Sequence, residues 1–161
     1  MEEFLKTNVT RLLDAKRINY KAYLLPVEKL GARETSEILN VPLERIFKTI
    51  VAIRQKPGKS VLAVIPGHHQ LDLKLLAEFF HEKKMILPTE KEAENLTGLQ
   101  AGGISPLALI NKGFQVVINT SANDFKTIHV SGGKRGLNLE LNTSDLADLT
   151  GASFANISSP M

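Results

Sequence analysis

Short strand-like segments recur along this chain at uneven intervals, and no internal repeat or linker divides them. Branched and alternating apolar residues predict strands at 18–24, 46–53, 60–65, 85–87, 114–119, 127–130 and 137–141. Helical spacing and capping residues predict helices at 3–16, 32–39, 73–80, 89–96 and 145–149. Because the helices do not alternate regularly with the strands, we expect an α+β fold rather than a doubly wound parallel sheet. Its predicted form is a mixed, strongly curved sheet or partial barrel flanked by short helices.

The segments between these elements carry turn and capping signals. The run Lys-Pro-Gly-Lys at 56–59 predicts a hairpin turn, and residues 66–70 predict a loop. Asp72 can cap the helix that follows it, and Thr89 with a glutamate three residues later forms a capping box. After residue 149 we expect a ragged tail.

The size and composition of the chain fit one domain spanning residues 1–161. The residues are 43% hydrophobic and 23% charged. No apolar run approaches the ~20 residues that a membrane span needs, so no membrane partner is expected. The first six residues, Met-Glu-Glu-Phe-Leu-Lys, have an acidic pair where a secretory signal has cations, which favours a cytoplasmic protein. The chain has no cysteine, which excludes disulfides, thiolate metal sites and a cysteine nucleophile.

Two glycine-rich segments stand out as possible binding loops. One is Val-Ser-Gly-Gly-Lys-Arg-Gly at 130–136, and the other is Ala-Gly-Gly-Ile-Ser-Pro at 101–106. Glycines allow close approach of the backbone to a ligand, and amides without side chains beside them can point at an anion or a carbonyl oxygen. A tight turn with a solvated basic tip is the structural alternative. Neither segment has the spacing of a Walker A loop or of a dinucleotide-binding G-x-G-x-x-G turn, which weakens any nucleotide-hydrolysis reading.

Four further side chains need a structural and a functional interpretation. Lys48 lies in the middle of an apolar strand, where it either points to solvent or aims its ammonium at a ligand. Tyr23 either packs in its strand or lines a pocket. The pair His68 and His69 resembles a metal site, but adjacent histidines rarely aim at one ion, so we expect no metal.

The order and spacing of three motifs resemble the YbaK family of stand-alone aminoacyl-tRNA editing domains. These motifs are Phe-Lys-Thr at 47–49, Gly-Gly-Ile-Ser-Pro at 102–106 and the glycine-rich segment at 130–137, with supporting similarity at 70–74 and 97–98. The resemblance covers nearly the whole chain and implies a YbaK-like fold. It also implies a cytoplasmic enzyme, without a cofactor, that removes cysteine wrongly attached to proline tRNA. Family members resemble the insertion domain of bacterial prolyl-tRNA synthetase, so that synthetase is an expected partner beside the acceptor end of the mischarged tRNA.

The resemblance also assigns roles to residues of this chain. Lys48 corresponds to the functional lysine of the family, which implies that it holds the aminoacyl ester or a phosphate and stabilises charge. The implied catalytic residues are therefore Lys48 and, beside the substrate carbonyl, Gly103. The implied substrate-binding residues are Tyr23, Gly102, Ser131, Gly132, Gly133 and Asn138.

The family resemblance implies that the substrate's own sulfur attacks the ester carbonyl, so that no protein nucleophile is needed. The sequence is compatible with this route because it offers no cysteine, no G-x-S-x-G elbow and no evident Ser-His-Asp arrangement. Two departures affect the amino-acid preference: Gly31, after Leu30, stands where related chains have an aromatic residue, and Asn138 stands where they have an acid. Thr49 and Ser131 favour the cysteine branch over the related alanine branch.

Three alternatives remain open at the level of the sequence. The chain could be a deacylase of another small amino acid. It could be a non-catalytic module that binds tRNA or a nucleotide. It could also be a regulatory or cell-surface-related protein, as some distant members are described, although the acidic start of the chain argues against this.

Overall fold

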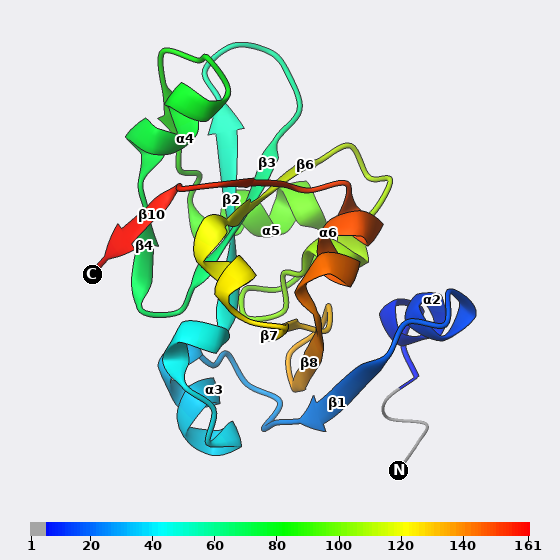
Figure 1. Ribbon diagram of the computed structural model, residues 1–161. Helices are drawn as coiled ribbons and strands as arrows, with labels where there is room; N and C mark the ends of the chain where they lie inside the picture. The colour runs from blue at the N-terminus through cyan, green and yellow to red at the C-terminus, as the bar shows by residue number, and fades with distance from the viewer. Residues whose placement is uncertain (1–5) are drawn as a thin grey trace.

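The computed structural model describes residues 6–161 and has mixed α and β structure (Figure 1). Its α-helices are α2 (Asn8–Ala15), α3 (Ala32–Leu39), α4 (Leu73–Phe79), α5 (Glu90–Thr97) and α6 (Thr143–Thr150). Its 3₁₀ turns are η1 (Leu43–Arg45), η2 (Pro106–Leu109) and η3 (Thr120–Asp124). Its strands are β1 (Tyr20–Leu24), β2 (Phe47–Arg54), β3 (Val61–Pro66), β4 (His69–Leu71), β5 (Met85–Ile86), β6 (Gln115–Asn119), β7 (Thr127–Ser131), β8 (Leu137–Asn142), β9 (Ser153–Ala155) and β10 (Ser158–Pro160).

The strands form one five-stranded sheet and two smaller ones. The larger sheet has the order β5-β2-β3-β6-β9, in which β2 and β3 are antiparallel while β6 runs parallel to both β3 and β9. A three-stranded antiparallel sheet has the order β1-β8-β7, and β4 pairs with β10. The predicted α+β class and mixed sheet are confirmed. The described strands form three sheets, none of which closes on itself, so the partial barrel is not confirmed.

Both faces of β3 are buried, which explains its uninterrupted apolar sequence. Leu62 and Val64 face a core shared with the three-stranded sheet, where Ile128 and Leu139 also lie. The alternate residues of β3 face a second core, which includes residues of α4, β5 and the segment before β10. Because successive side chains of a strand point to opposite faces, one short strand supports both cores.

The five-stranded sheet and the three-stranded sheet meet beside the start of β2. Ile46, the residue before β2, forms a parallel bridge with His129 in the middle of β7. This contact brings β2 against β7, which in turn pairs with β8. The strand that carries Lys48 is therefore fixed beside the strands that flank the second glycine loop.

Several predicted boundaries need correction. The predicted loop at 66–70 gives way to β4 from His69, and the predicted ragged tail contains β9 and β10, with Ile157 between them fully buried. Three-residue strands have too little periodicity to be read from sequence, and they form because β4 and β6 offer pairing edges. In Figure 1 the carboxy-terminal strand β10 lies beside β4.

The first and last predicted helices also begin elsewhere. The first begins at Asn8, since Thr7 adopts extended geometry and caps it, and residues 3–5 of the prediction lie outside the described residues. The last helix begins at Thr143, two residues earlier than predicted, with Asn142 as its cap. None of the helices described between residues 6 and 161 combines the length and the apolarity needed to cross a membrane.

Candidate active site

A cavity of about 300 Å³ opens where β2, the two glycine-rich segments and the start of α3 meet. Its walls include four of the residues predicted to form a site: Lys48, Gly102, Ser131 and Asn138. The departure at Gly31, with the preceding Leu30, also lies in its lining, as do the ion-paired Lys29 and Glu90. The structure therefore gathers residues from four separate parts of the sequence around one hollow.

Lys48 extends from β2 into this cavity and is half-buried. Its Nζ donates a hydrogen bond to the carbonyl oxygen of Gly67 at 3.3 Å. Burial lowers the pKa of Lys48, and no carboxylate of the described residues forms an ion pair with it. The positive charge is thus partly desolvated and has only a neutral oxygen as its partner, which leaves it able to bind an anion or to stabilise developing negative charge.

The bridge between Ile46 and His129 explains how Lys48 comes to lie near Ser131. Two residues further along each of these parallel segments lie Lys48 and Ser131. Side chains two apart in a strand share a face, so the cation and the hydroxyl approach the same space. Both line the cavity.

The two glycine-rich segments also contact each other. The Arg135 guanidinium donates from Nε to the carbonyl oxygen of Ala101 at 2.7 Å. A Cβ atom at Gly103 would lie 2.9 Å from the Cα of Lys134 and 3.0 Å from the backbone nitrogen of Arg135, so only glycine permits this approach. The prediction that both segments face one cavity is confirmed for Gly102 and Ser131.

Most of the glycine amides are already used inside their own loops, which corrects the expectation of bare donors. Gly103 donates to the carbonyl oxygen of Gln100 at 2.8 Å, and Gly132 donates to that of Leu137 at 2.9 Å. Gly133 donates to Ser131 Oγ at 3.2 Å. These bonds close the turns. Within the described residues, the amides of Gly102 and Gly136 have no such acceptor, and both residues line the cavity.

Of the predicted site residues, Gly103, Gly132, Gly133 and Tyr23 do not line this cavity. Gly132 and Gly133 line a different hollow, of about 520 Å³, between α2, η2 and Lys134. The Tyr23 hydroxyl donates to Glu140 Oε1 at 3.0 Å, and its ring lies 5.6 Å from that of His129. The antiparallel pairing of Tyr23 with Asn138 puts Tyr23 beside a cavity residue, but its side chain turns toward Glu140.

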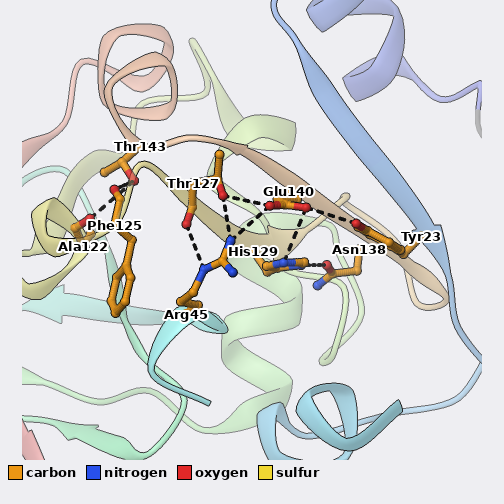
Figure 2. Close-up of polar contacts among 9 residues, drawn as sticks. All are labelled: Tyr23, Arg45, Ala122, Phe125, Thr127, His129, Asn138, Glu140 and Thr143. Atoms are coloured by element: carbon orange, nitrogen blue, oxygen red, sulfur yellow. Dashed lines mark hydrogen bonds and ion pairs between the residues drawn. The ribbon is translucent and has the colours of Figure 1, made fainter. Parts of the chain in front are cut away.

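A polar network that was not predicted lies behind the cavity (Figure 2). Glu140 accepts hydrogen bonds from Tyr23, from Thr127 Oγ1 at 2.8 Å and from Arg45 Nη2 at 3.0 Å. Burial alone would raise the pKa of Glu140, but the hydrogen bonds from Thr127 and Tyr23 outweigh it and the pKa is lowered. The available signal in the sequence was the pair of polar residues at alternate positions of the strand at 137–141.

His129 connects this network to the cavity. Its ring is 1% exposed, and Nδ1 lies 2.8 Å from Oδ1 of Asn138. Burial, the largest influence, lowers the pKa of His129 despite the hydrogen bond with Asn138 and the nearby charge of Glu140. The neighbouring pair His68 and His69 lies elsewhere, with His69 hydrogen-bonded to Ser158. Among residues 6–161, no group of three or more histidine, aspartate or glutamate side chains is arranged to hold a metal ion.

Comparison with known proteins identifies the family of this chain. Residues 28–149 match the aminoacyl-tRNA editing domain family. The chain belongs to this family. The matched segment includes Lys48, both glycine-rich segments and Asn138, and it begins after Tyr23.

Two curated relatives of very different length match this chain. The chain is 38% identical over 154 residues to EbsC of Enterococcus faecalis (strain ATCC 700802 / V583), a proposed Cys-tRNA(Pro)/Cys-tRNA(Cys) deacylase. That match covers 94% of this chain and 93% of EbsC. A 120-residue stretch is 25% identical to the proline–tRNA ligase of Staphylococcus aureus (strain MRSA252), covering 71% of this chain and 20% of the ligase.

Solved structures share the fold of this editing domain. The crystal structure of hypothetical protein APE2540 has a TM-score of 0.86 at 24% identity, covering 95% of this chain and all of that one. A proposed trans-editing enzyme for prolyl-tRNA synthetase has a TM-score of 0.79 at 21% identity, covering 96% of this chain and 98% of its own. At these identities the similarity establishes the fold alone.

Proposed function

We propose that this protein is an aminoacyl-tRNA deacylase that removes cysteine from mischarged tRNA(Pro). The observation that carries the proposal is the half-buried Lys48, which lines a cavity without an ion-pair partner in the described chain. Membership of the editing-domain family and 38% identity to EbsC, over nearly the full length of both chains, support the reaction and the substrate. Residues 1–161 would then act as one cytoplasmic editing domain.

The size of the cavity favours the acceptor end of the tRNA as its ligand. At about 300 Å³ it lies at the lower end of the range for small-molecule sites, roughly 300–1,000 Å³. It can therefore admit an aminoacyl group and part of the terminal ribose, while the rest of the tRNA stays outside. Ile50, Ile104 and Leu137 supply apolar wall, and Lys48 supplies the charge.

An editing site separate from the amino-acid pocket of the synthetase is needed because cysteine and proline are similar in size. A pocket that admits one side chain rejects another of similar volume only by roughly 10–200-fold, so discrimination must use chemistry as well as size. The thiol offers that chemistry. We propose that prolyl-tRNA synthetase supplies the mischarged substrate, in line with the similarity of this chain to one fifth of the staphylococcal ligase.

In the proposed reaction the substrate thiol loses its proton and its sulfur bonds to the ester carbonyl carbon. The carbonyl carbon–oxygen bond to the ribose breaks, and the ribose oxygen leaves with a proton from solvent. The products are tRNA and a cyclic thioester, which water opens to free cysteine. No electrons are exchanged with another reactant, and no protein nucleophile is consumed.

The cavity residues support this route in distinct ways. The ammonium of Lys48 stabilises the negative charge that develops on the carbonyl oxygen, and the amides of Gly102 and Gly136 are candidate backbone donors to the same oxygen. Ser131 accepts a hydrogen bond from Gly133 and has no histidine or carboxylate as a hydrogen-bond partner in residues 6–161, so nothing there activates it as a nucleophile. In this scheme Gly103, Gly132, Gly133 and Tyr23 shape the loops and strand around the site.

The test is a comparison of tRNA(Pro) charged with cysteine, serine or alanine. We expect release of cysteine at least about 100-fold faster than serine, because only the thiol can attack its own ester efficiently at neutral pH. Equal rates for cysteine and serine would overturn the thiol-assisted route. Stoichiometric binding of charged tRNA without release of any amino acid would replace the enzyme with a non-catalytic tRNA-binding module.

A further inference from the structure

Asn138 is a cavity residue whose side chain is hydrogen-bonded to the buried ring of His129. It is 5% exposed, lines the cavity, and uses Oδ1 to contact the His129 ring. Its amide nitrogen has no hydrogen-bond partner among the described residues, and it is not a fully enclosed atom. The two N–H groups of Asn138 are therefore available to whatever occupies the cavity.

The arrangement around Glu140 determines which ring nitrogen of His129 carries the proton. Glu140 already accepts from three donors, one each from Tyr23, Thr127 and Arg45. His129 Nε2 lies 3.9 Å from Glu140 Oε1, which is beyond hydrogen-bond length. Nε2 therefore makes no hydrogen bond to Glu140 that would require a proton on it. Oδ1 of Asn138 can only accept, so the nitrogen facing it, Nδ1, must donate.

We propose that His129 is a positioning residue: it donates from Nδ1 to Asn138 Oδ1 and thereby fixes the N–H edge of Asn138 toward the cavity. The cavity then offers a neutral donor at this wall, which recognises an oxygen acceptor of the acylated ribose. Tyr23, Thr127 and Arg45 act one step further back, by holding Glu140 beyond hydrogen-bond distance of His129 Nε2 (Figure 2). The identity of the acceptor as a ribose or ester oxygen rests on the proposed function.

The geometry also explains why this wall selects oxygen acceptors over ammonium groups. If Asn138 were free to rotate, it would present either its oxygen or its nitrogen to the ligand with equal steric fit. The Nδ1–H donor of His129 removes this choice, since the opposite orientation would place two N–H donors against each other. The groups that face the ring are Asn138 and Glu140 on β8, Tyr23 on β1 and Arg45 of η1.

Two substitutions separate positioning from packing. H129N removes the ring but keeps an amide N–H close to the position of Nδ1, whereas H129L removes the ring and the donor. Both lose the contact with Tyr23, so we expect similar falls in melting temperature. With Cys-tRNA(Pro) as substrate, we expect kcat/KM to fall about tenfold in H129L and to stay within about threefold of wild type in H129N, the loss of one oriented hydrogen bond. Equal loss of kcat/KM in the two variants would overturn the proposal.

A spectroscopic readout keeps the proposal testable even if the protein has no deacylase activity. In ¹⁵N NMR, protonated and unprotonated imidazole nitrogens have separate chemical shifts, and the signals of His129 are those missing from H129N. We expect the proton on Nδ1 and a bare Nε2 at neutral pH. A proton on Nε2 with a bare Nδ1 would reverse the orientation of Asn138 and overturn the inference, whatever the outcome of the deacylation assay.

Discussion

Arg45 and Lys48 lie three residues apart in the sequence, yet the structure treats their charges in opposite ways. Arg45 donates to Glu140 and to Thr127, and the Arg45 and Glu140 side chains are 27% and 17% exposed. Lys48 is half-buried in a cavity wall with a single backbone carbonyl as its partner. The Arg45 guanidinium thus completes a network of hydrogen-bonded side chains, whereas the Lys48 ammonium remains available to a ligand.

The difference indicates how a structural charge can be told from a functional one. Burying a charge is unfavourable unless hydrogen bonds or an opposite charge offset it. The hydrogen bonds of Arg45 to Glu140 and Thr127 offset the cost of burying its charge, so removing the arginine should destabilise the fold. The single hydrogen bond of Lys48 to a neutral carbonyl offsets the cost of burying its charge only in part. Removing the lysine should therefore leave the fold intact and reduce binding or catalysis.

The largest expected effect is on the activity of K48A. We predict a fall in the rate of cysteine release of at least about 100-fold, equivalent to about 2.7 kcal/mol of transition-state stabilisation. The free energy of unfolding should change by less than about 1 kcal/mol, because an unpaired, partly desolvated charge contributes little to stability. Single-turnover deacylation and urea unfolding measure the two quantities.

A matched control for K48A is K56A, in the exposed turn between β2 and β3. This variant removes the same charge from the same hairpin, outside the cavity. We expect wild-type deacylation from it. A loss of activity in K56A equal to that in K48A would mean that overall charge, and not the position of Lys48, determines the rate.

The next largest effect is expected for R45A, with the opposite pattern. Removing the guanidinium leaves the charge of Glu140 without its ion partner and Thr127 without one of its contacts. We predict a loss of about 2–3 kcal/mol in unfolding free energy, below the usual range for fully buried pairs because this pair is partly exposed. Urea unfolding checks the loss. An unchanged stability would break the distinction between the two cations.

A smaller effect is expected where the cavity wall depends on backbone contact. In G103A the new methyl group would meet the backbone of Lys134 and Arg135, which must move to admit it. We predict a loss of about 1–2 kcal/mol in unfolding free energy and reduced deacylation. The control is G58A, where the new methyl would meet the Arg54 side chain and no backbone atom. If both variants behave alike, the close approach of the two glycine-rich segments has no energetic importance.

The smallest expected effect is a pH dependence of stability that arises from His129. Its pKa is lowered by burial from an ordinary value of 6.5, so the unfolded chain binds a proton more readily than the folded one. This contribution is complete above pH 6.5 and is lost as the pH falls toward the folded pKa. We predict that H129N flattens the stability profile in this window, measured by urea unfolding at a series of pH values. A slope unchanged in H129N would assign the acid sensitivity to other groups, such as His69, whose pKa is also lowered by burial.

The elements that a sequence can predict here are those with enough length for periodicity. The hairpin of β2 and β3, the capping box at Thr89 and the strand β8 were all predicted from local patterns. The strands β4, β9 and β10 were missed because three residues carry no period, and their pairing partners are distant in sequence. Contacts that join remote segments, such as the bridge between Ile46 and His129, leave no local signal.

The candidate site also combines residues that the sequence could predict with contacts that depend on the fold. The motif resemblance identified Lys48, Gly102, Ser131 and Asn138, which the structure brings together around one cavity. It could not show that the Gly103 amide is used inside its own turn, because that depends on the local geometry of the loop. Nor could it identify the network of Arg45 and Glu140, whose parts come from residues nearly a hundred positions apart.

The most direct test of the account is a titration of ¹⁵N-labelled protein with a stable, amide-linked 3′-cysteinylamino adenosine. The account predicts shift changes at Gly102, Ser131 and the side-chain amide of Asn138, with K48A weakening the binding. It predicts no comparable changes in the hollow lined by Lys112 and Gly133, or in the one lined by Tyr20 and Lys126. Shift changes gathered at either of those hollows, with the residues around Lys48 unaffected, would contradict it.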